Sequence, residues 1–404
     1  MTEPLPPGFP LERPATAPLD PPPSHLQLRT DQRLARVSIY DGRLQPYLVT
    51  RYEDARAVLG SDAFSTDPTP RPGMPEFPSW REGQQQGPRG FFKSYDEPVH
   101  SLMRKALTRE FMVKRINALR PGIERLTGEL LDEMTAKGSS ADLVEQFALP
   151  LPSLVICDLL GVPYEDHDFF QQHAKVFVDF AATPDQVVQA QKELGEYLDV
   201  LVARKRAEPG DDVVTRLAGQ VDAGAISARD AADLAAFVLF AGHETTANMI
   251  SLSVVALLHN PDQIPTLLAG PQEAANATEE LLRYLTIVHG GVRRYTVKEV
   301  EIAGITLQPG DGVIVPLGLA NRDPEVFGDP DRLDLQRANA RQHVAFSYGI
   351  HQCLGQPLAR AEMQIVLPEI FRRLPDLRIT VPLDEIDFKQ NTFVYGLNSL
   401  PITW

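Results

Sequence analysis

One cysteine near the C-terminal end lies where a thiolate could do chemistry. Cys353 belongs to the stretch FSYGIHQCLGQP, residues 346–357, with one glycine four residues before it and another two residues after it. Glycine lets the backbone turn tightly and approach a flat partner closely. Pro357 and the apolar residues behind it predict a helix that begins just after the cysteine. The free N–H groups and the positive dipole end of such a helix favour a thiolate.

Several roles are open to this cysteine, the simplest being that of a small buried apolar residue. A nucleophile needs a base that is oriented by a third group, and His351, two residues away, is poorly placed to be that base. A zinc site needs three or four ligands. The other cysteine, Cys157, lies in the apolar run LPSLVICDLLG and is predicted to be core. Ligation of haem iron by a single thiolate remains, in which sulfur favours O–O cleavage.

A second polar motif, AGHETT at residues 241–246, interrupts an apolar segment. His-Glu on a helix can begin a zinc-protease site, but the required second histidine is replaced by Ala247. Gly242 costs about 1 kcal/mol in a helix interior, so its missing side chain should make room for something, such as a flat macrocycle and O2. Thr245 can donate to the carbonyl of residue 241 or turn toward O2. Glu244 can pass protons into a dry pocket.

These motifs resemble those of the cytochrome P-450 superfamily. Phe346-x-x-Gly349-x-x-x-Cys353-x-Gly355 matches the haem-binding signature of that family in every defined position, and Ala359 and Glu362 extend the match. Ala241-Gly242-x-Glu244-Thr245 matches the family's acid–alcohol pair, and Glu280-Leu-Leu-Arg283 matches its helical ExxR pair. The resemblance runs from about residue 30 to Trp404 and is that of a soluble bacterial, actinomycete-type member.

The resemblance implies a role for each matching residue. Cys353 would ligate the iron of haem b (iron protoporphyrin IX), and Glu244 and Thr245 would manage protons. The cofactor would be bound by His100, Arg104, Ala241, Gly242, Arg294, Phe346, Gly349, His351 and Gly355. Arg293 competes with Arg294 as a propionate partner, because two alignments of this segment differ by one residue. A buried triad of Glu280, Arg283 and Arg332 would fix the backbone around the cysteine loop.

The resemblance also implies a hydrophobic pocket and separate electron donors. The pocket would be lined by Phe177, Phe180, Phe237, Val288 and Phe393, and a Pro/Gly/Gln-rich loop over residues 64–92 would cover substrate access. No flavin or nicotinamide motif occurs, so electrons would come from a ferredoxin and an NAD(P)H-dependent ferredoxin reductase. The basic stretch 103–115 is either the docking face for an acidic ferredoxin or a solvated helix face.

A largely helical scaffold is needed to position these residues. Apolar residues at steps of three and four predict one helix through Ile116, Leu119, Ile123, Leu126, Leu130 and Met134. Ser227 and Asp230 predict the start of a helix that runs to about His259, roughly 45 Å long. Short strands are predicted in 295–316 and 377–404. We expect a mainly α protein with a minor β part, the cytochrome P-450 fold, as one haem-binding domain over residues 31–404 with a long central helix.

Composition narrows the class of protein further. A formal net charge of −15 argues against nucleic-acid binding, and two cysteines suit a reducing compartment. Nine prolines in the first 23 residues predict an extended arm over residues 1–30 in place of a signal peptide. The most apolar segment, 234–258, carries polar residues at its middle, which predicts a buried helix and not a membrane span. We expect a cytoplasmic protein.

The function predicted from the sequence is that of a haem-thiolate monooxygenase, which hydroxylates or epoxidises a hydrophobic secondary metabolite or xenobiotic with O2. One alternative is a peroxygenase that uses H2O2. The intact Glu–Thr pair argues against it, because a peroxide route does not need relayed protons. The other alternative is a haem carrier or sensor without turnover, against which the long loop and the oxygen-handling helix speak.

Overall fold

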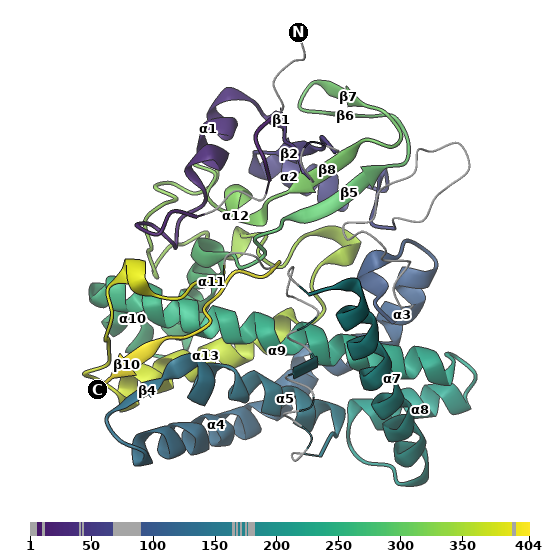
Figure 1. Cartoon of the computed structure of the whole chain (residues 1–404), viewed down its shortest axis with the longest axis vertical. Helices are drawn as coiled ribbons and strands as arrows, with labels where there is room; N and C mark the ends of the chain where they lie inside the picture. The colour runs from purple at the N-terminus through teal and green to yellow at the C-terminus, as the bar shows by residue number, and fades with distance from the viewer. Residues whose placement is uncertain are drawn as a thin grey trace. The chain divides into compact units, whose positions relative to one another are not determined.

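The computed structural model describes residues 6–9, 13–39, 42, 44–67, 90–163, 166, 169, 172–173, 176, 182–389 and 393–404. Within it the chain divides into two compact units, each assembled from three stretches of sequence (Figure 1). Unit 1 comprises Met1–Phe77, Val255–Cys353 and Val381–Gly396, and unit 2 comprises Pro78–Val254, Leu354–Thr380 and Leu397–Trp404. The prediction of a mainly helical chain with a minor β part is confirmed.

Unit 2 is the helical one. Its described helices are α3 (Val99–Thr108), α4 (Val113–Ala136), α5 (Pro150–Leu160), α7 (Pro184–Ala207), α8 (Val213–Asp222), α13 (Gln356–Arg373) and α9 (Ala228–His259) as far as Val254. Shorter turns are η1 (Phe92–Ser94), η2 (Arg109–Phe111) and η3 (Val144–Ala148). A small antiparallel sheet has the order β4 (Ser140–Asp142), β10 (Pro401–Thr403), β9 (Arg378–Ile379). Helices α4 and α13 lie side by side (Figure 1).

Two helices of unit 2 confirm predictions made from residue spacing and capping residues in the sequence. In α4 the side chains of Ile116, Ile123, Leu130 and Met134 are buried on one face. Helix α9 begins at Ala228, because Ser227 and Asp230 cap it reciprocally: each backbone N–H donates to the other side chain at 3.0 Å. None of the described helices combines the length and the apolar character needed to cross a membrane.

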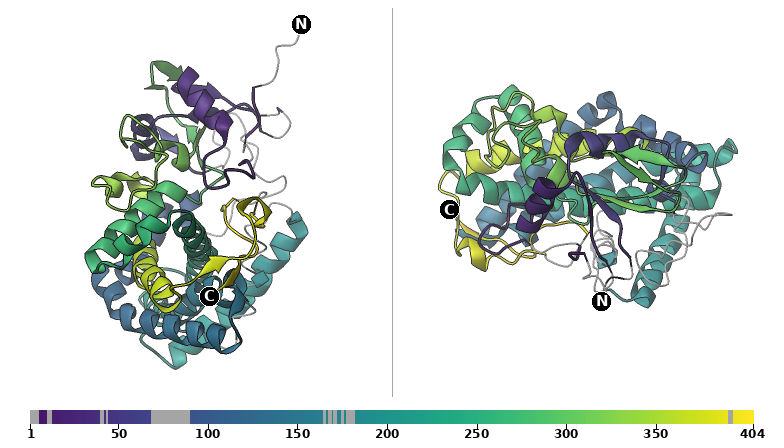
Figure 2. Two further views of the ribbon diagram at one scale, coloured as in Figure 1. Left: turned by 90° about the vertical axis from the view of Figure 1, so that its left-hand side faces the viewer. Right: turned by 90° about the horizontal axis from the view of Figure 1, so that it is seen from above.

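Unit 1 contains a five-stranded sheet that gathers distant parts of the chain (Figure 2). The strand order is β1 (Leu34–Arg36), β2 (Tyr47–Val49), β8 (Gly312–Val315), β5 (Val292–Thr296), β3 (Phe64–Ser65), and only β2 and β8 run parallel. Strands β6 (Val300–Ile302) and β7 (Ile305–Leu307) form a hairpin. Its helices are α1 (Pro23–Asp31), α2 (Tyr52–Gly60), α10 (Ile264–Leu268), α11 (Pro271–Leu285) and α12 (Leu317–Ala320). Its 3-10 turns are η5 (Pro261–Gln263), η6 (Ala340–Gln342), η7 (Gly349–His351) and η8 (Leu383–Glu385).

The N-terminal segment corrects one expectation. Residues 23–31 form helix α1, where an extended arm was predicted, because a proline at the first helical position is compatible with a helix and the residues behind it continue one. The segment is also partly buried: Phe9, Leu19 and His25 are covered, with Phe9 stacked on His25. The guanidinium of Arg13 lies 4.1 Å from the centroid of the Tyr395 ring. This segment is therefore part of the core of unit 1.

Candidate functional site

The cysteine loop lies at the end of the second stretch of unit 1, which closes with Cys353. Cys353 follows the short turn η7 and stands three residues before α13, where a helix was predicted to begin. Its backbone N–H donates to the carbonyl of Phe346 at 2.9 Å, which closes the loop. Cys353 is exposed, whereas Cys157 is buried, and burial raises the pKa of the Cys157 thiol to about 12. The core prediction for Cys157 is confirmed, and the ligand role of Cys353 stays a prediction.

Gly349 is required by its surroundings. Its φ of +76° lies in the left-handed region, and a Cβ atom there would stand 2.4 Å from the carbonyl oxygen of Leu59 in α2. This glycine therefore approaches the backbone of α2 closely, and its approach to a flat partner stays a prediction. Gly349 fixes the path of the chain that leads to Cys353.

The polar motif of α9 has the predicted hydrogen bond and an unexpected packing contact. The hydroxyl of Thr245 donates to the carbonyl of Ala241 at 2.7 Å, and Glu244 is buried. A Cβ atom on Gly242 would lie 2.4 Å from the Cδ1 atom of Ile156 in α5. The missing side chain thus leaves room for Ile156 of α5, and the space expected for a macrocycle and O2 stays a prediction.

The predicted propionate partners occupy positions in both units. In unit 2, His100 and Arg104 share α3, one turn apart. His100 is 2% exposed, its Nδ1 lies 3.3 Å from Glu97 Oε1, and desolvation lowers its pKa. In unit 1, Arg294 of β5 is 4% exposed, while Arg293 is half-buried. Arg294 Nη1 donates to the carbonyl of Arg293 at 2.9 Å, and the choice of Arg294 over Arg293 stays a prediction.

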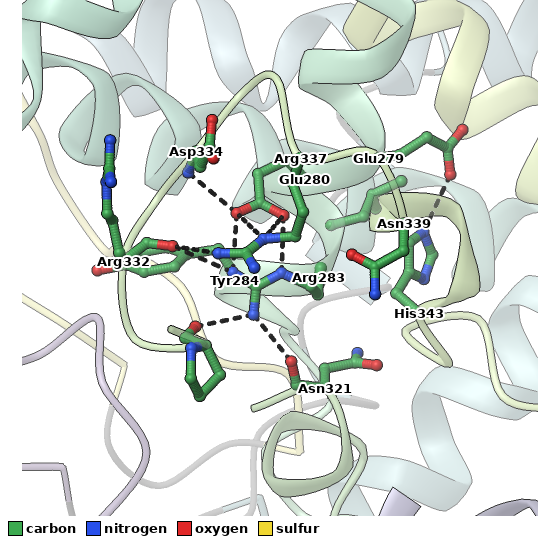
Figure 3. Close-up of polar contacts among 12 residues, drawn as sticks. Glu279, Glu280, Arg283, Tyr284, Asn321, Arg332, Asp334, Arg337, Asn339 and His343 are labelled. Atoms are coloured by element: carbon green, nitrogen blue, oxygen red, sulfur yellow. Dashed lines mark hydrogen bonds and ion pairs between the residues drawn. The ribbon is translucent and has the colours of Figure 1, made fainter. Parts of the chain in front are cut away.

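The most fully buried ion cluster of unit 1 contains Glu280 and Arg283 of α11 (Figure 3). Both side chains are 0% exposed, and two hydrogen bonds join them: Arg283 Nε to Glu280 Oε2 at 2.7 Å, and Nη2 to Oε1 at 2.8 Å. The third member is Arg337, whose Nε donates to both carboxylate oxygens at 3.1 Å.

The prediction of Arg332 as the third member is wrong. Its side chain is exposed, and only its backbone carbonyl takes part, by accepting from Arg283 Nη2 at 3.3 Å and from Arg337 Nη2 at 3.0 Å. Asp329, with a φ of +49°, turns the chain before Arg332, and Arg337 reaches back to Glu280. Nothing in the spacing of these residues along the chain indicated that Arg337 would return to Glu280.

Further buried polar groups, not singled out from the sequence, hold the segment that precedes the cysteine loop. The carbonyls of Asn321 and Pro330 accept from Arg283 Nη1 at 2.9 and 2.8 Å. Asn321 Oδ1 accepts from the backbone N–H of Val344 at 2.7 Å, and His343 Nε2 lies 3.1 Å from Glu279 Oε2. Together with the ion cluster (Figure 3), these bonds fix the backbone between residues 321 and 344, and Phe346 follows two residues later.

The predicted pocket residues divide between the two units. In unit 2, Phe237 of α9 packs against Phe91 and Phe92 with ring-centroid distances of 5.4 and 4.9 Å. In unit 1, Val288 forms a β-bridge with Val394, and the N–H of His289 donates to the carbonyl of Phe393 at 3.1 Å. Phe177, Phe180 and residues 68–89 of the predicted access loop lie outside the described residues.

Glu362, which extended the sequence match, is buried in α13. It is 1% exposed, and desolvation raises its pKa well above the usual range.

The basic stretch 103–115 is exposed only in part. Lys105, Arg109 and Lys114 are exposed, whereas Arg115 pairs with Asp211 at 2.9 Å, which raises the pKa of Arg115. Three cations of this stretch are thus exposed, and the choice between a docking face and a solvated helix face stays open.

Comparison with known proteins agrees with these features. The family described as cytochrome P450 matches residues 275–402. Cytochrome P450-SU2 of Streptomyces griseolus is 47% identical, over 98% of this chain and 96% of its own length. Pentalenic acid synthase of Streptomyces avermitilis is 44% identical over 100% of both chains. The crystal structure of CYP105P1 in complex with filipin I superimposes with a TM-score of 0.90, at 37% identity and over 99% of each chain.

Proposed function

Since this chain belongs to the cytochrome P450 family and is an oxidoreductase, we propose that it hydroxylates or epoxidises a hydrophobic small molecule with O2 and electrons from a ferredoxin system. The exposed Cys353 carries the proposal. It ends a loop that Gly349 and the Phe346 carbonyl hold in one path, with α13 beginning three residues later.

The residues of the chain fit haem b as the cofactor. Cys353 supplies a thiolate of the kind that ligates haem iron, and the two acidic propionates need cationic or N–H partners. His100, Arg104, Arg294 and His351 would be those partners. Haem b, when bound, supplies the iron centre at which O2 is activated.

Proton delivery falls to the polar motif of α9. The Thr245 hydroxyl, which donates to the Ala241 carbonyl, can rotate and donate toward O2. Glu244, buried one residue earlier, is the acid that carries protons toward this hydroxyl. This division of roles supports an O2-dependent reaction over the peroxide route.

The substrate proposed is a lipophilic secondary metabolite. One relative is named for the synthesis of an acid, pentalenic acid, and one structural neighbour holds filipin I. Phe237, Val288 and Phe393 would contact the substrate. The exposed Lys105, Arg109 and Lys114 support docking of an acidic ferredoxin, and the scarcity of cysteine supports a cytoplasmic location.

The decisive test compares two serine variants. Reduced wild-type protein with carbon monoxide should show a band near ~450 nm, as expected of thiolate-bound haem, and about one iron per chain. Cys353→Ser should lose the band, and Cys157→Ser, the matched control in the core, should keep it. Absence of the band and of iron from the wild type would refute the proposal.

Assays with different oxidants distinguish the monooxygenase from the peroxygenase and from a haem carrier or sensor. Product formation from a hydrophobic compound library should require O2, ferredoxin, reductase and NAD(P)H. Turnover with H2O2 alone at the same rate would instead support the peroxygenase, and haem binding without turnover under either condition would support the carrier or sensor.

A further inference from the structure

A lysine lies within the aromatic contacts of unit 2. Lys93 belongs to the run FFKSY and to the short turn η1, and its Nζ lies 5.9 Å from the centroid of the Phe240 ring on α9. Phe240 is the residue immediately before Ala241 and Gly242 of the polar motif. The neighbours of Lys93 pack on the same helix, because Phe91 and Phe92 both contact Phe237. Lys93 is therefore held against the turn of α9 that leads into the oxygen-handling residues.

The environment of Lys93 differs from that of a surface lysine. Its side chain is exposed, yet the surrounding protein desolvates the ammonium and lowers its pKa. A lysine on the outer surface keeps its ammonium in bulk water. The rings that pack around η1 and this turn of α9, those of Phe91, Phe92, Phe237 and Phe240, make the surroundings of Lys93 apolar.

From this placement, and resting on the proposed function, we infer that Lys93 is a specificity-determining residue that selects substrates carrying a carboxylate on a lipophilic skeleton. Phe237 and Phe240 would contact the skeleton, and the Lys93 ammonium would bind the carboxylate. Such charge-assisted hydrogen bonds are roughly twice as strong as neutral ones, and they strengthen where water is excluded.

The inference can be tested by spectral titration of the ferric holoenzyme. One probe is 1-phenylimidazole, whose azole nitrogen ligates haem iron. The other three are its derivatives with one carboxylate at the ortho, meta or para position of the phenyl ring, which are positional isomers of one another. For Lys93→Met we expect at least one carboxylated isomer to bind about tenfold or more weakly than to the wild type, in keeping with a charged hydrogen bond. The affinity for 1-phenylimidazole should change by less than about twofold, and Lys93→Arg should keep most of the affinity for that isomer.

Two outcomes would overturn the inference. One is that none of the three carboxylated isomers loses affinity in Lys93→Met. The other is that all four probes weaken equally, which would mean that Lys93 only supports the fold. Lys137→Met, a change at an exposed lysine after α4, is the matched control and should leave every affinity unchanged. If Lys93→Met does not retain haem, Lys93→Gln serves for the same comparison.

The readouts separate this inference from the proposed function. A wild type without the carbon monoxide band would refute the haem-thiolate enzyme itself. A wild type with the band, but with carboxylate affinities that do not depend on Lys93, would refute the specificity role alone.

Discussion

Glu280 carries a fully buried carboxylate to which two arginines donate hydrogen bonds. Removing one partner from such a cluster leaves an uncompensated charge, which costs about 3–5 kcal/mol. We expect Arg337→Ala to lose about that much unfolding free energy and most of its haem. Urea denaturation and the ratio of haem to protein measure the two effects.

Arg332→Ala is the matched control for that experiment. The Arg332 side chain is exposed and only its carbonyl belongs to the cluster, so its removal should change stability by no more than about 0.5 kcal/mol. Equal losses in the two variants would contradict the assignment of Arg337.

Glu362 provides a second prediction at the scale of a single residue. Its folded-state pKa is raised by burial, so above pH 4.5 the folded chain keeps a proton that the unfolded chain releases. The unfolding free energy should therefore fall as pH rises, and Glu362→Gln, which cannot ionise, should remove this fall. We expect Glu362→Gln to match the wild type at pH 5 and to exceed it at pH 8. Parallel pH profiles would contradict this account.

The contact between η7 and α2 carries a prediction at the scale of elements. Gly349→Ala would force a Cβ atom toward the Leu59 carbonyl at a backbone angle that disfavours side chains. We expect a loss of about 2–4 kcal/mol of unfolding free energy and a weaker carbon monoxide band. Gly122→Ala is the control: it lies inside α4 with open space at its Cβ, and should stabilise by about 0.5–1 kcal/mol. The prediction fails if Gly349→Ala is as stable as the wild type.

Elements with a repeating pattern could be predicted from the sequence. Helix α4 and the start of α9 follow from apolar spacing and capping residues, and β5 to β8 follow from their turn residues. Helix α1 could not be predicted, since its proline run is typical of extended chain.

Contacts between segments that are distant in the chain could not be predicted from the sequence. Cys353, the Glu280–Arg283 pair and the Thr245 hydrogen bond were predicted because each depends on close spacing. Arg337, the packing reason for Gly242 and the position of Lys93 depend on segments that are distant in the chain. No periodicity reports such contacts.

The stability of the whole chain should depend on two buried histidines of unit 1. Desolvation lowers the pKa of His25 to about 4 and that of His289 to about 3, and the nearby charge of Arg13 acts in the same direction. Unfolded histidine binds a proton near pH 6.5. Below that pH the unfolded state holds more protons, so the unfolding free energy must fall until the folded pKa values are reached.

We expect acidification from pH 7 to pH 5 to remove about 2–4 kcal/mol through these two groups. His25→Gln should lose roughly half of that pH dependence. Urea denaturation at the two pH values measures it, and an unchanged difference between them in His25→Gln would contradict the assignment.

The division of each unit into three stretches has a consequence for biosynthesis. Residues 381–396 belong to unit 1 and residues 397–404 to unit 2, so the ribosome must release nearly the entire polypeptide before either unit has all its parts. At about 5–20 residues per second, an early-folding N-terminal half would wait on the order of ten seconds or more for its missing strands. Nascent chains of this protein should therefore depend on chaperones until termination, and neither unit can be produced as a contiguous gene fragment.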